Sequence, residues 1–465
     1  MSTNCMPKIF LVIALLTAVC NAQSGNGRTG MVRTIVSETP AIGSINLGGL
    51  NIEYAGTSRV DHYLDEGANG FWSKLPPSEK WRKFSGKTVR ISERPSKDVE
   101  VEVLSASPLW QPTTGMYKTV AVLLTIVPTN TTAAPMNVSP AMVRNSLYDS
   151  ANSVDRFYRE ASFGAFGFRG VNSPTSETFS YIIQTAISSE CQQQIVSEFT
   201  SSVRQSLLGN GINTYDGTVD LGIIIFNDVA GCPPYPFATR GELGARGVPL
   251  WMWIPTSWFT TGSQIVTHEI GHALGNNHPA SIHCSDWNNT STCSVVDSSD
   301  RDIMASAGRY GMLPNNFERR RWGWHSENAF SAGSLISTEL LDLLSPRSVS
   351  PRTRLNRRRY LNFSLNGPWA GWQVFPEARS NIGVFDQFNG TDAKYRRGVT
   401  LRLGHSYYID PDTTSFLIND SGGDDADAPL MPGETFSFGG VRITPTLEWN
   451  PRTGTRISIG TEPSN

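Results

Sequence analysis

The stretch that constrains this chain most is the run His-Glu-Ile-Gly-His-Ala-Leu-Gly-Asn-Asn-His at residues 268–278. His268 and His272 are four positions apart, so on a helix they project from one face, one turn apart. Gly275 then allows the chain to leave the helix through a conformation that other residues resist. This reversal brings His278 back toward the first two histidines. The run therefore predicts a helix, a sharp exit and three imidazole rings in one place.

Three converging imidazoles are typical of a zinc site, and a fourth position left open to water is typical of a catalytic one. Glu269 follows the first histidine directly, where its carboxylate can reach a water molecule on the metal without binding the metal itself. We therefore expect His268, His272 and His278 to hold one Zn²⁺ and Glu269 to act as the general base.

Chance and a structural metal site are the competing interpretations of this motif. A bare His-Glu-x-x-His pattern arises by chance, but the chain has only seven histidines and three of them fall in this window. A structural zinc ion needs a fourth protein ligand, for which His283 and Cys284 are the candidates. The catalytic interpretation is preferred, because three protein ligands leave one position open.

The extended motif followed by a methionine in a tight turn is the signature of the metzincin proteases. Met304, in the segment 302–306, is the expected turn methionine beneath the metal. Some metzincins carry a tyrosine ligand two residues after it, but Ser306 stands there, so three protein ligands are predicted. Tyr310 is a candidate for stabilising an oxyanion, although a packed or surface tyrosine is the simpler interpretation.

The chain resembles the gametolysin-like metalloproteases, secreted metzincins typified by an algal enzyme that digests cell-wall glycoprotein. The resemblance covers approximately residues 120–440 and departs at Ala305, where glycine is usual in the family. It implies zinc-dependent endopeptidase activity on proteins or glycoproteins of an extracellular matrix or cell wall. Besides the zinc motif, it is carried by Val120–Thr125, Phe157–Gly164, Asp297–Met304, Asn316–Trp324 and Leu430–Phe436.

Hydrophobic patterning predicts an α/β (α+β) metzincin-like catalytic domain between two β-rich domains. Val120–Val127 is a nearly continuous apolar run, as in strands buried on both faces, and Ser139-Pro140 begins a helix. Core strands are expected at Leu221–Phe226 and Val248–Ile254, either of which is a candidate to flank a cleft where peptide pairs as an added strand. The predicted division is a signal peptide at 1–22, a small β-rich N-terminal domain (a pro-domain by one hypothesis) at 23–112, the zinc protease domain at 113–330 and an all-β domain at 331–465.

Cysteines and sequons point to export. Lys8 and the apolar core Ile9–Val19 predict a signal peptide, and no later apolar run is long enough to span a membrane. The four cysteines outside the predicted signal peptide favour disulfides, and three connectivities are open. A short loop favours Cys284–Cys293, which leaves Cys191–Cys232. Asn-x-Ser/Thr sequons, which support a secretory route without proving it, begin at Asn130, Asn137, Asn288, Asn289, Asn362, Asn389 and Asn419.

Charge excludes one class of partner. The formal net charge is −2, from 41 acidic and 39 basic residues, and nothing in that balance indicates nucleic acid. The basic clusters Arg319–Arg321 and Arg357–Arg359 are interpreted as solvated loop charges. Asp420–Asp427 offers oxygen ligands for Ca²⁺, but its spacing is not that of a known calcium loop, so a solvated loop is preferred.

Together these features predict a secreted zinc metalloendopeptidase, located in the extracellular space, cell wall or matrix, with a protein or glycoprotein substrate. The alternative is a catalytically inactive adhesion or wall-binding protein with a protease-like zinc domain. The intact Glu269 favours the enzyme. A zinc hydrolase with another substrate is a third interpretation. No cysteine lies between Gln23 and Glu190, so a prosegment thiol cannot cap the metal, and the oligomeric state is not predicted.

Overall fold

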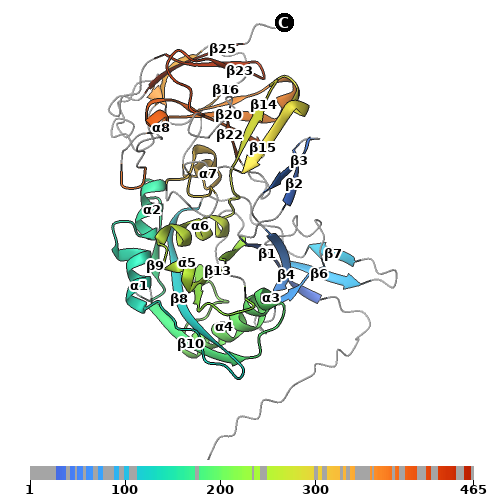
Figure 1. Ribbon diagram of the computed structural model, residues 1–465, viewed down its shortest axis with the longest axis vertical. Coiled ribbons are helices and arrows are strands. Elements are labelled where there is room, and N and C mark those ends of the chain that lie inside the picture. Colours follow the sequence, from blue (N-terminus) through green and yellow to red (C-terminus); the bar gives the residue numbers. More distant parts are fainter. Residues whose placement is uncertain are drawn as a thin grey trace, which may run out of the picture.

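The computed structural model has a mixed α/β fold with several sheets, as expected from the sequence (Figure 1). The signal peptide, Ser306, Tyr310, Asn389 and the acidic stretch 420–427 lie outside the described residues. The described residues are 28–37, 42–47, 50–55, 59–65, 72–76, 88–93, 99–103, 113–172, 177–232, 235–240, 249–297, 302–305, 312–324, 328–330, 336–340, 357–358, 361–379, 383–386, 393–405, 415–419, 428–446 and 455–461.

The largest sheet has a parallel centre. Strands β10, β8, β11 and β13 run parallel in that order, and every residue of β11 and β13 is buried, which explains their uninterrupted apolar sequences. The predicted strands at 221–226 and 248–254 are therefore both present. The bounds are β8 (Gly115–Pro128), β9 (Phe166–Gly170), β10 (Glu177–Thr185), β11 (Leu221–Phe226), β12 (Phe237–Arg240) and β13 (Leu250–Pro255).

Helices cover both faces of this sheet. On one face α2 and α6 pack on alternate side chains of β11 and β13, such as Ile223 and Met252. On the other face the helical segment 191–209 packs on the remaining side chains, including Ile224 and Trp253. The bounds are α1 (Pro140–Arg144), α2 (Val154–Ala161), α3 (Cys191–Gln194), α4 (Thr200–Gly209), α5 (Thr256–Phe259) and α6 (Ser263–Ala273), with π-helical segments at Asn145–Asp149 and Ile195–Phe199.

The N-terminal strands continue the same sheet. Strand β1 pairs antiparallel with β12, from Thr34 opposite Arg240 to Ser37 opposite Phe237, and Ile35 is fully buried in the core of the sheet. Strand β12 is thus paired on both sides, by β13 and by β1. The domain boundary at 112/113 stays a prediction. The bounds are β1 (Arg28–Ser37), β2 (Ile42–Leu47), β3 (Leu50–Ala55), β4 (Arg59–Asp65), β5 (Trp72–Lys74), β6 (Thr88–Glu93) and β7 (Val99–Val103).

The C-terminal part is built on two further sheets with a shared aromatic core that includes Trp287, Trp369 and Phe438. Strands β14 and β15, which follow the histidine motif directly, belong to the first of these sheets. The first contains β14 (Ala280–Cys284), β15 (Cys293–Asp297), β16 (Asn328–Phe330), β19 (Leu361–Ser364), β20 (Trp372–Glu377), β21 (Thr400–His405) and β22 (Ser415–Ile418). The second contains β17 (Ile336–Leu340), β18 (Arg357–Arg358), β23 (Phe436–Phe438), β24 (Val441–Pro445) and β25 (Thr455–Thr461).

The interpretation of Arg319–Arg321 as solvated loop charges is wrong. These arginines lie on helix α7 (Asn316–Arg321), which runs between α6 and the C-terminal sheets (Figure 1), and all three are buried. Arg319 donates to the carbonyl of Pro314 (2.8 Å) and Arg320 to Oε1 of Gln373 (2.7 Å). Among the described residues, further helical segments are α8 (Ala393–Arg397) and the 3-10 turns at Thr290–Thr292 and Gly367–Trp369. In the described part of the chain, no helix is both long and apolar enough to cross a membrane.

Candidate metal centre

Helix α6 carries the first part of the motif, and every residue from Ile265 to Ala273 is buried. The helix stops as the sequence predicts. Gly275 has a φ of +97°, its N–H donates to the carbonyl of His272 (2.8 Å), and the N–H of Asn276 donates to that of Gly271 (3.0 Å). This pair of hydrogen bonds is the Schellman pattern, which requires a left-handed residue at the glycine position. The chain therefore turns back toward the helix face that carries the histidines.

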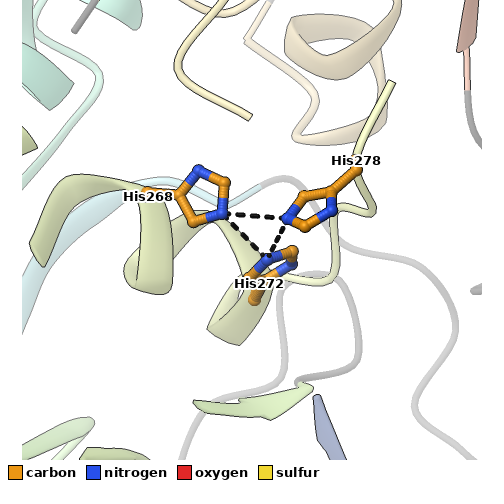
Figure 2. Close-up of side chains that lie close together, drawn as sticks. All are labelled: His268, His272 and His278. Carbon is orange, nitrogen blue, oxygen red and sulfur yellow. Dashed lines mark hydrogen bonds between the residues drawn. The ribbon is translucent and has the colours of Figure 1, made fainter. Parts of the chain in front are cut away.

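The structure brings His268, His272 and His278 together (Figure 2). Their Nε2 atoms form a nearly equilateral triangle, with separations of 3.1 Å between His268 and His272 and 3.0 Å from each of these to His278. His268 and His272 are each 1% exposed, whereas His278 is only partly buried. Three ring nitrogens thus meet at one point, with two of the rings inside the protein.

Backbone carbonyls determine which nitrogens face that point. Nδ1 of His268 lies 2.6 Å from the carbonyl oxygen of Ile303, and Nδ1 of His272 lies 2.9 Å from that of Asn276. A carbonyl oxygen can only accept a hydrogen bond, so each Nδ1 carries the proton and donates. In the neutral rings, both Nε2 atoms then present lone pairs to one another. Lone pairs that converge in this way repel unless a cation lies between them.

The donor set fits zinc. Neutral imidazole nitrogens are ligands that Zn²⁺ prefers, and second hydrogen bonds from the far ring nitrogen normally orient such ligands. A tetrahedral ion with bonds of about 2.0–2.1 Å separates its ligand atoms by about 3.3 Å, close to the separations of the triangle. Among the described residues, this is the one group of three such side chains near enough to hold an ion. The three histidines can therefore bind a metal ion such as zinc.

Met304 lies directly against helix α6, which carries His268 and His272. It is fully buried in the turn 302–305, and a Cβ atom placed on Gly271, in the middle of the motif, would overlap its sulfur. Glycine at position 271 is thus required by close packing, a role the sequence did not reveal. Glu269 is also fully buried on α6, beside His268. Its role as general base stays a prediction.

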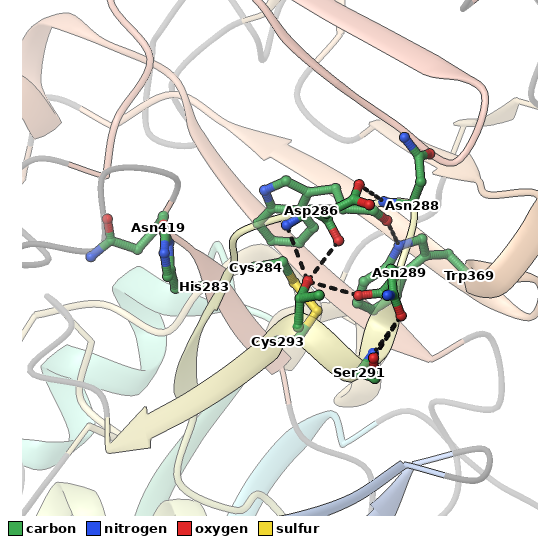
Figure 3. The surroundings of a disulfide bond; sticks show 11 residues. His283, Cys284, Asp286, Asn288, Asn289, Ser291, Cys293, Trp369 and Asn419 are labelled. Atoms are coloured by element: carbon green, nitrogen blue, oxygen red, sulfur yellow. Dashed lines mark hydrogen bonds between the residues drawn. A yellow bond between two sulfur atoms is a disulfide. The ribbon is translucent and has the colours of Figure 1, made fainter. Parts of the chain in front are cut away.

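The two candidates for a fourth ligand of a structural zinc ion, His283 and Cys284, both make other contacts. Cys284 forms a disulfide with Cys293 and so has no thiolate to offer, while Nδ1 of His283 lies 3.0 Å from the carbonyl oxygen of Asn419 (Figure 3). The second disulfide joins Cys191 to Cys232. Both predicted pairings are confirmed. Neither His283 nor Cys284 belongs to the three-histidine group.

Burial separates the sequons. Asn288 and Asn289 are exposed in the loop closed by the Cys284–Cys293 disulfide (Figure 3), and Asn130 and Asn137 are exposed as well. Asn362 and Asn419 are only 1% and 3% exposed. A glycan is bulky and needs a surface position, so the last two sequons cannot carry one in the folded chain.

Comparisons with known proteins leave the family open. No protein-family model and no curated protein matches the chain. Solved structures match distantly: wild-type OgpA from Akkermansia muciniphila is 10% identical, with a TM-score of 0.29 over 77% of this chain and 96% of OgpA. Catalytically inactive OgpA in complex with an O-glycopeptide (glycodrosocin) substrate is 11% identical, with a TM-score of 0.27 over 77% and 95%. TM-scores this low do not establish a shared fold, so nothing about this chain follows from them.

Proposed function

We propose that this chain is a secreted zinc-dependent endopeptidase of the metzincin type, similar to the gametolysin-like proteases. The observation that carries the proposal is the triangle of Nε2 atoms, 3.0–3.1 Å apart, on and beside a buried helix that also carries Glu269. Three protein ligands leave a coordination position for water or substrate, which a closed structural site lacks. Met304 beneath the helix is a second feature expected of this class.

The chain's own residues divide the work. His268, His272 and His278 hold the ion, and the carbonyls of Ile303 and Asn276 keep two of the rings in the tautomer that can bind it. Bound zinc polarises a peptide carbonyl and increases the acidity of a water molecule. Glu269 accepts the proton of that water at its carboxylate and delivers it to the amine of the departing product.

Proteins or glycoproteins outside the cell are the proposed substrates. Support comes from the two disulfides, which are typical of oxidising compartments, and from the sequence motifs shared with the gametolysin-like family. A peptide that adds to the sheet would not meet β11 or β13, because both are interior strands. Beyond β13, the next strand that contacts α6 is β12. Strand β12 already pairs with β13 on one side and with β1 on the other, so a peptide would not pair with it directly.

The direct test measures cleavage of casein or gelatin by the purified chain, with and without a chelator. We expect cleavage that the chelator abolishes and added Zn²⁺ restores. Glu269→Gln serves as the matched control, because it keeps the size of the side chain and removes its basicity. A chain that binds zinc through the three histidines but cleaves neither substrate would instead support the inactive wall-binding alternative.

A further inference from the structure

The carboxylate of Asp302 accepts hydrogen bonds from the backbone of the turn 302–305, which packs against helix α6, and of the segment that follows. One oxygen, Oδ1, accepts the N–H of Met304 (2.8 Å), and the other, Oδ2, accepts the N–H of Asn315 (2.7 Å). The Asp302 carbonyl also accepts the N–H of Ala305 (3.1 Å). The side chain is fully buried. One buried carboxylate thus ties the turn at 302–305 to the backbone N–H of Asn315, thirteen residues after Asp302.

This turn supplies two contacts to the site. The carbonyl of Ile303 lies 2.6 Å from Nδ1 of His268, and Met304 packs against Gly271 between the two helical histidines. Both residues lie within two positions of Asp302, so their placement depends on the hydrogen bonds that its carboxylate makes. The orientation of a ligand histidine through its second ring nitrogen contributes to metal affinity.

The other end of the link is fixed by the C-terminal part. Asn315 caps helix α7 by accepting the N–H of Glu318 (3.1 Å), and its amide nitrogen donates to Oγ of Ser415 on β22 (3.3 Å). Nearby, Arg379 donates to the carbonyl of Leu313 (2.6 Å). Burial lowers the pKa of Arg379, but the negative charges of Asp386, Glu377 and Asp302 outweigh it and raise the pKa, so the guanidinium stays charged.

We propose that Asp302 is a positioning residue, which holds the Ile303 carbonyl against His268 and thereby sets the metal affinity and ligand geometry of the site. It touches neither the metal nor the substrate. The proposal rests on the metal site proposed above. A carboxylate anchored to the C-terminal part, and not the local turn sequence alone, fixes the tautomer and the direction of the His268 ring.

The test is a set of variants of the full chain, read by zinc affinity and by the absorption spectrum of Co²⁺ in the site. In Asp302→Asn, the one remaining side-chain oxygen can accept only one of the two backbone N–H groups, and the new NH₂ group faces the other as donor against donor. We expect zinc affinity to fall by about tenfold to a hundredfold, the effect typical of losing such a supporting contact, with a shifted Co²⁺ spectrum. Asp302→Ser can still accept the N–H of Met304 and loses the contact with Asn315 without placing a donor against it, so its zinc affinity should fall between those of wild type and Asp302→Asn.

Asp386→Asn is the matched control. Asp386 is also a buried carboxylate beside Arg379 and also accepts a backbone N–H, that of Leu313 (3.1 Å), but it makes no hydrogen bond to the turn 302–305. It should lower the midpoint of thermal unfolding while leaving zinc affinity within about twofold and the Co²⁺ spectrum unchanged. If Asp302→Asn behaves like this control, with an unchanged spectrum and affinity, the positioning role is refuted.

Hydrogen exchange in the unmodified chain covers the case in which Asp302 variants do not fold. The N–H groups of Met304 and Asn315 should stay protected in the metal-free protein, because the carboxylate holds them without help from the ion. Fast exchange there, beside protected amides in β11, would overturn the proposal. A wild-type chain that binds no zinc refutes the metal site itself, whereas zinc binding without proteolysis refutes only the enzymatic function.

Discussion

Helices α6 and α7 both carry polar side chains into the interior, but they arrange them in different ways. On α6 the ring nitrogens of His268 and His272 converge on each other and on His278. On α7 the arginines diverge toward separate acceptors of the protein, as Arg319 does to Pro314 and Arg320 to Gln373. Burial of polar groups is common to both. Convergence of several imidazole nitrogens on one point, rather than divergence toward separate acceptors, is what marks a candidate metal-ligand site.

Removing two of the converging nitrogens should have the largest effect. His268→Ala combined with His272→Ala should abolish stoichiometric zinc binding and all metal-dependent cleavage, because one histidine cannot hold the ion. Elemental analysis of the purified protein measures the zinc content. Arg320→Leu on α7 is the counterpart and should keep the zinc. Zinc retained in the double variant would show that the three histidines are not the site.

Replacement of the general base separates chemistry from binding. Glu269→Gln should keep both zinc and fold but lower kcat for casein by at least about a hundredfold, since general-base help is worth about 10² to 10⁴. His278→Ala should instead weaken metal binding first, and excess zinc should partly restore its activity. Near-full activity in Glu269→Gln would end the protease proposal, and loss of zinc would make Glu269 a ligand.

Close packing under the site gives the next effect. Gly271→Ala should destabilise the protein by about 1–3 kcal/mol, because the new methyl group must displace the buried Met304. Gly209→Ala, at the last position of α4 where a Cβ meets no atom within 4 Å, is the control and should be neutral or slightly stabilising. Chemical denaturation measures both. Equal stability of the two variants would contradict the contact between Met304 and the metal helix.

The divergent arginines should affect stability alone. Arg320→Leu removes a charged hydrogen bond to Gln373 and should cost about 1.5–3 kcal/mol of unfolding free energy. Zinc affinity per folded molecule should not change, because Gln373, which accepts a hydrogen bond from Arg320, lies on β20 and not at the histidines. A parallel loss of zinc affinity would show that α7 and α6 are coupled more closely than the contacts indicate.

Glu160 gives the smallest expected effect. Burial raises the pKa of this half-buried carboxyl above its ordinary value of 4.5, even though the backbone N–H groups of Val384 and Phe385 donate to it. A raised pKa in the folded state means that its contribution to stability is full below the ordinary pKa and is lost as pH rises through the folded pKa. Wild type should therefore lose stability relative to Glu160→Gln over that interval, measured as the difference in Tm. A difference that is independent of pH would contradict the raised pKa.

The motif and the buried strands could be predicted from sequence because short-range geometry determines them. The four-residue spacing of His268 and His272, the left-handed turn at Gly275 and the apolar run of β11 are each encoded within a few residues. The disulfide Cys284–Cys293 was predicted for the same reason, since nine residues of chain keep its ends near each other. The predicted domain boundaries and the roles assigned to Glu269 and to the metal stay predictions.

Long-range pairing decided the rest. Strand β12 is four residues long, too short for a periodic pattern, and its partner β1 lies some two hundred residues earlier in the chain. The sequence led us to interpret the arginines of α7 as solvated. A charged side chain is buried only where acceptors satisfy it, and an acceptor distant in the sequence, such as Gln373, is not visible in the local pattern. The sequence by itself determined the three-histidine motif and the helix that carries two of its members. Only the tertiary structure could show which backbone carbonyls contact the Nδ1 atoms of His268 and His272 and which carboxylate accepts the N–H groups of Met304 and Asn315, because several of these contacts join segments that no local pattern connects.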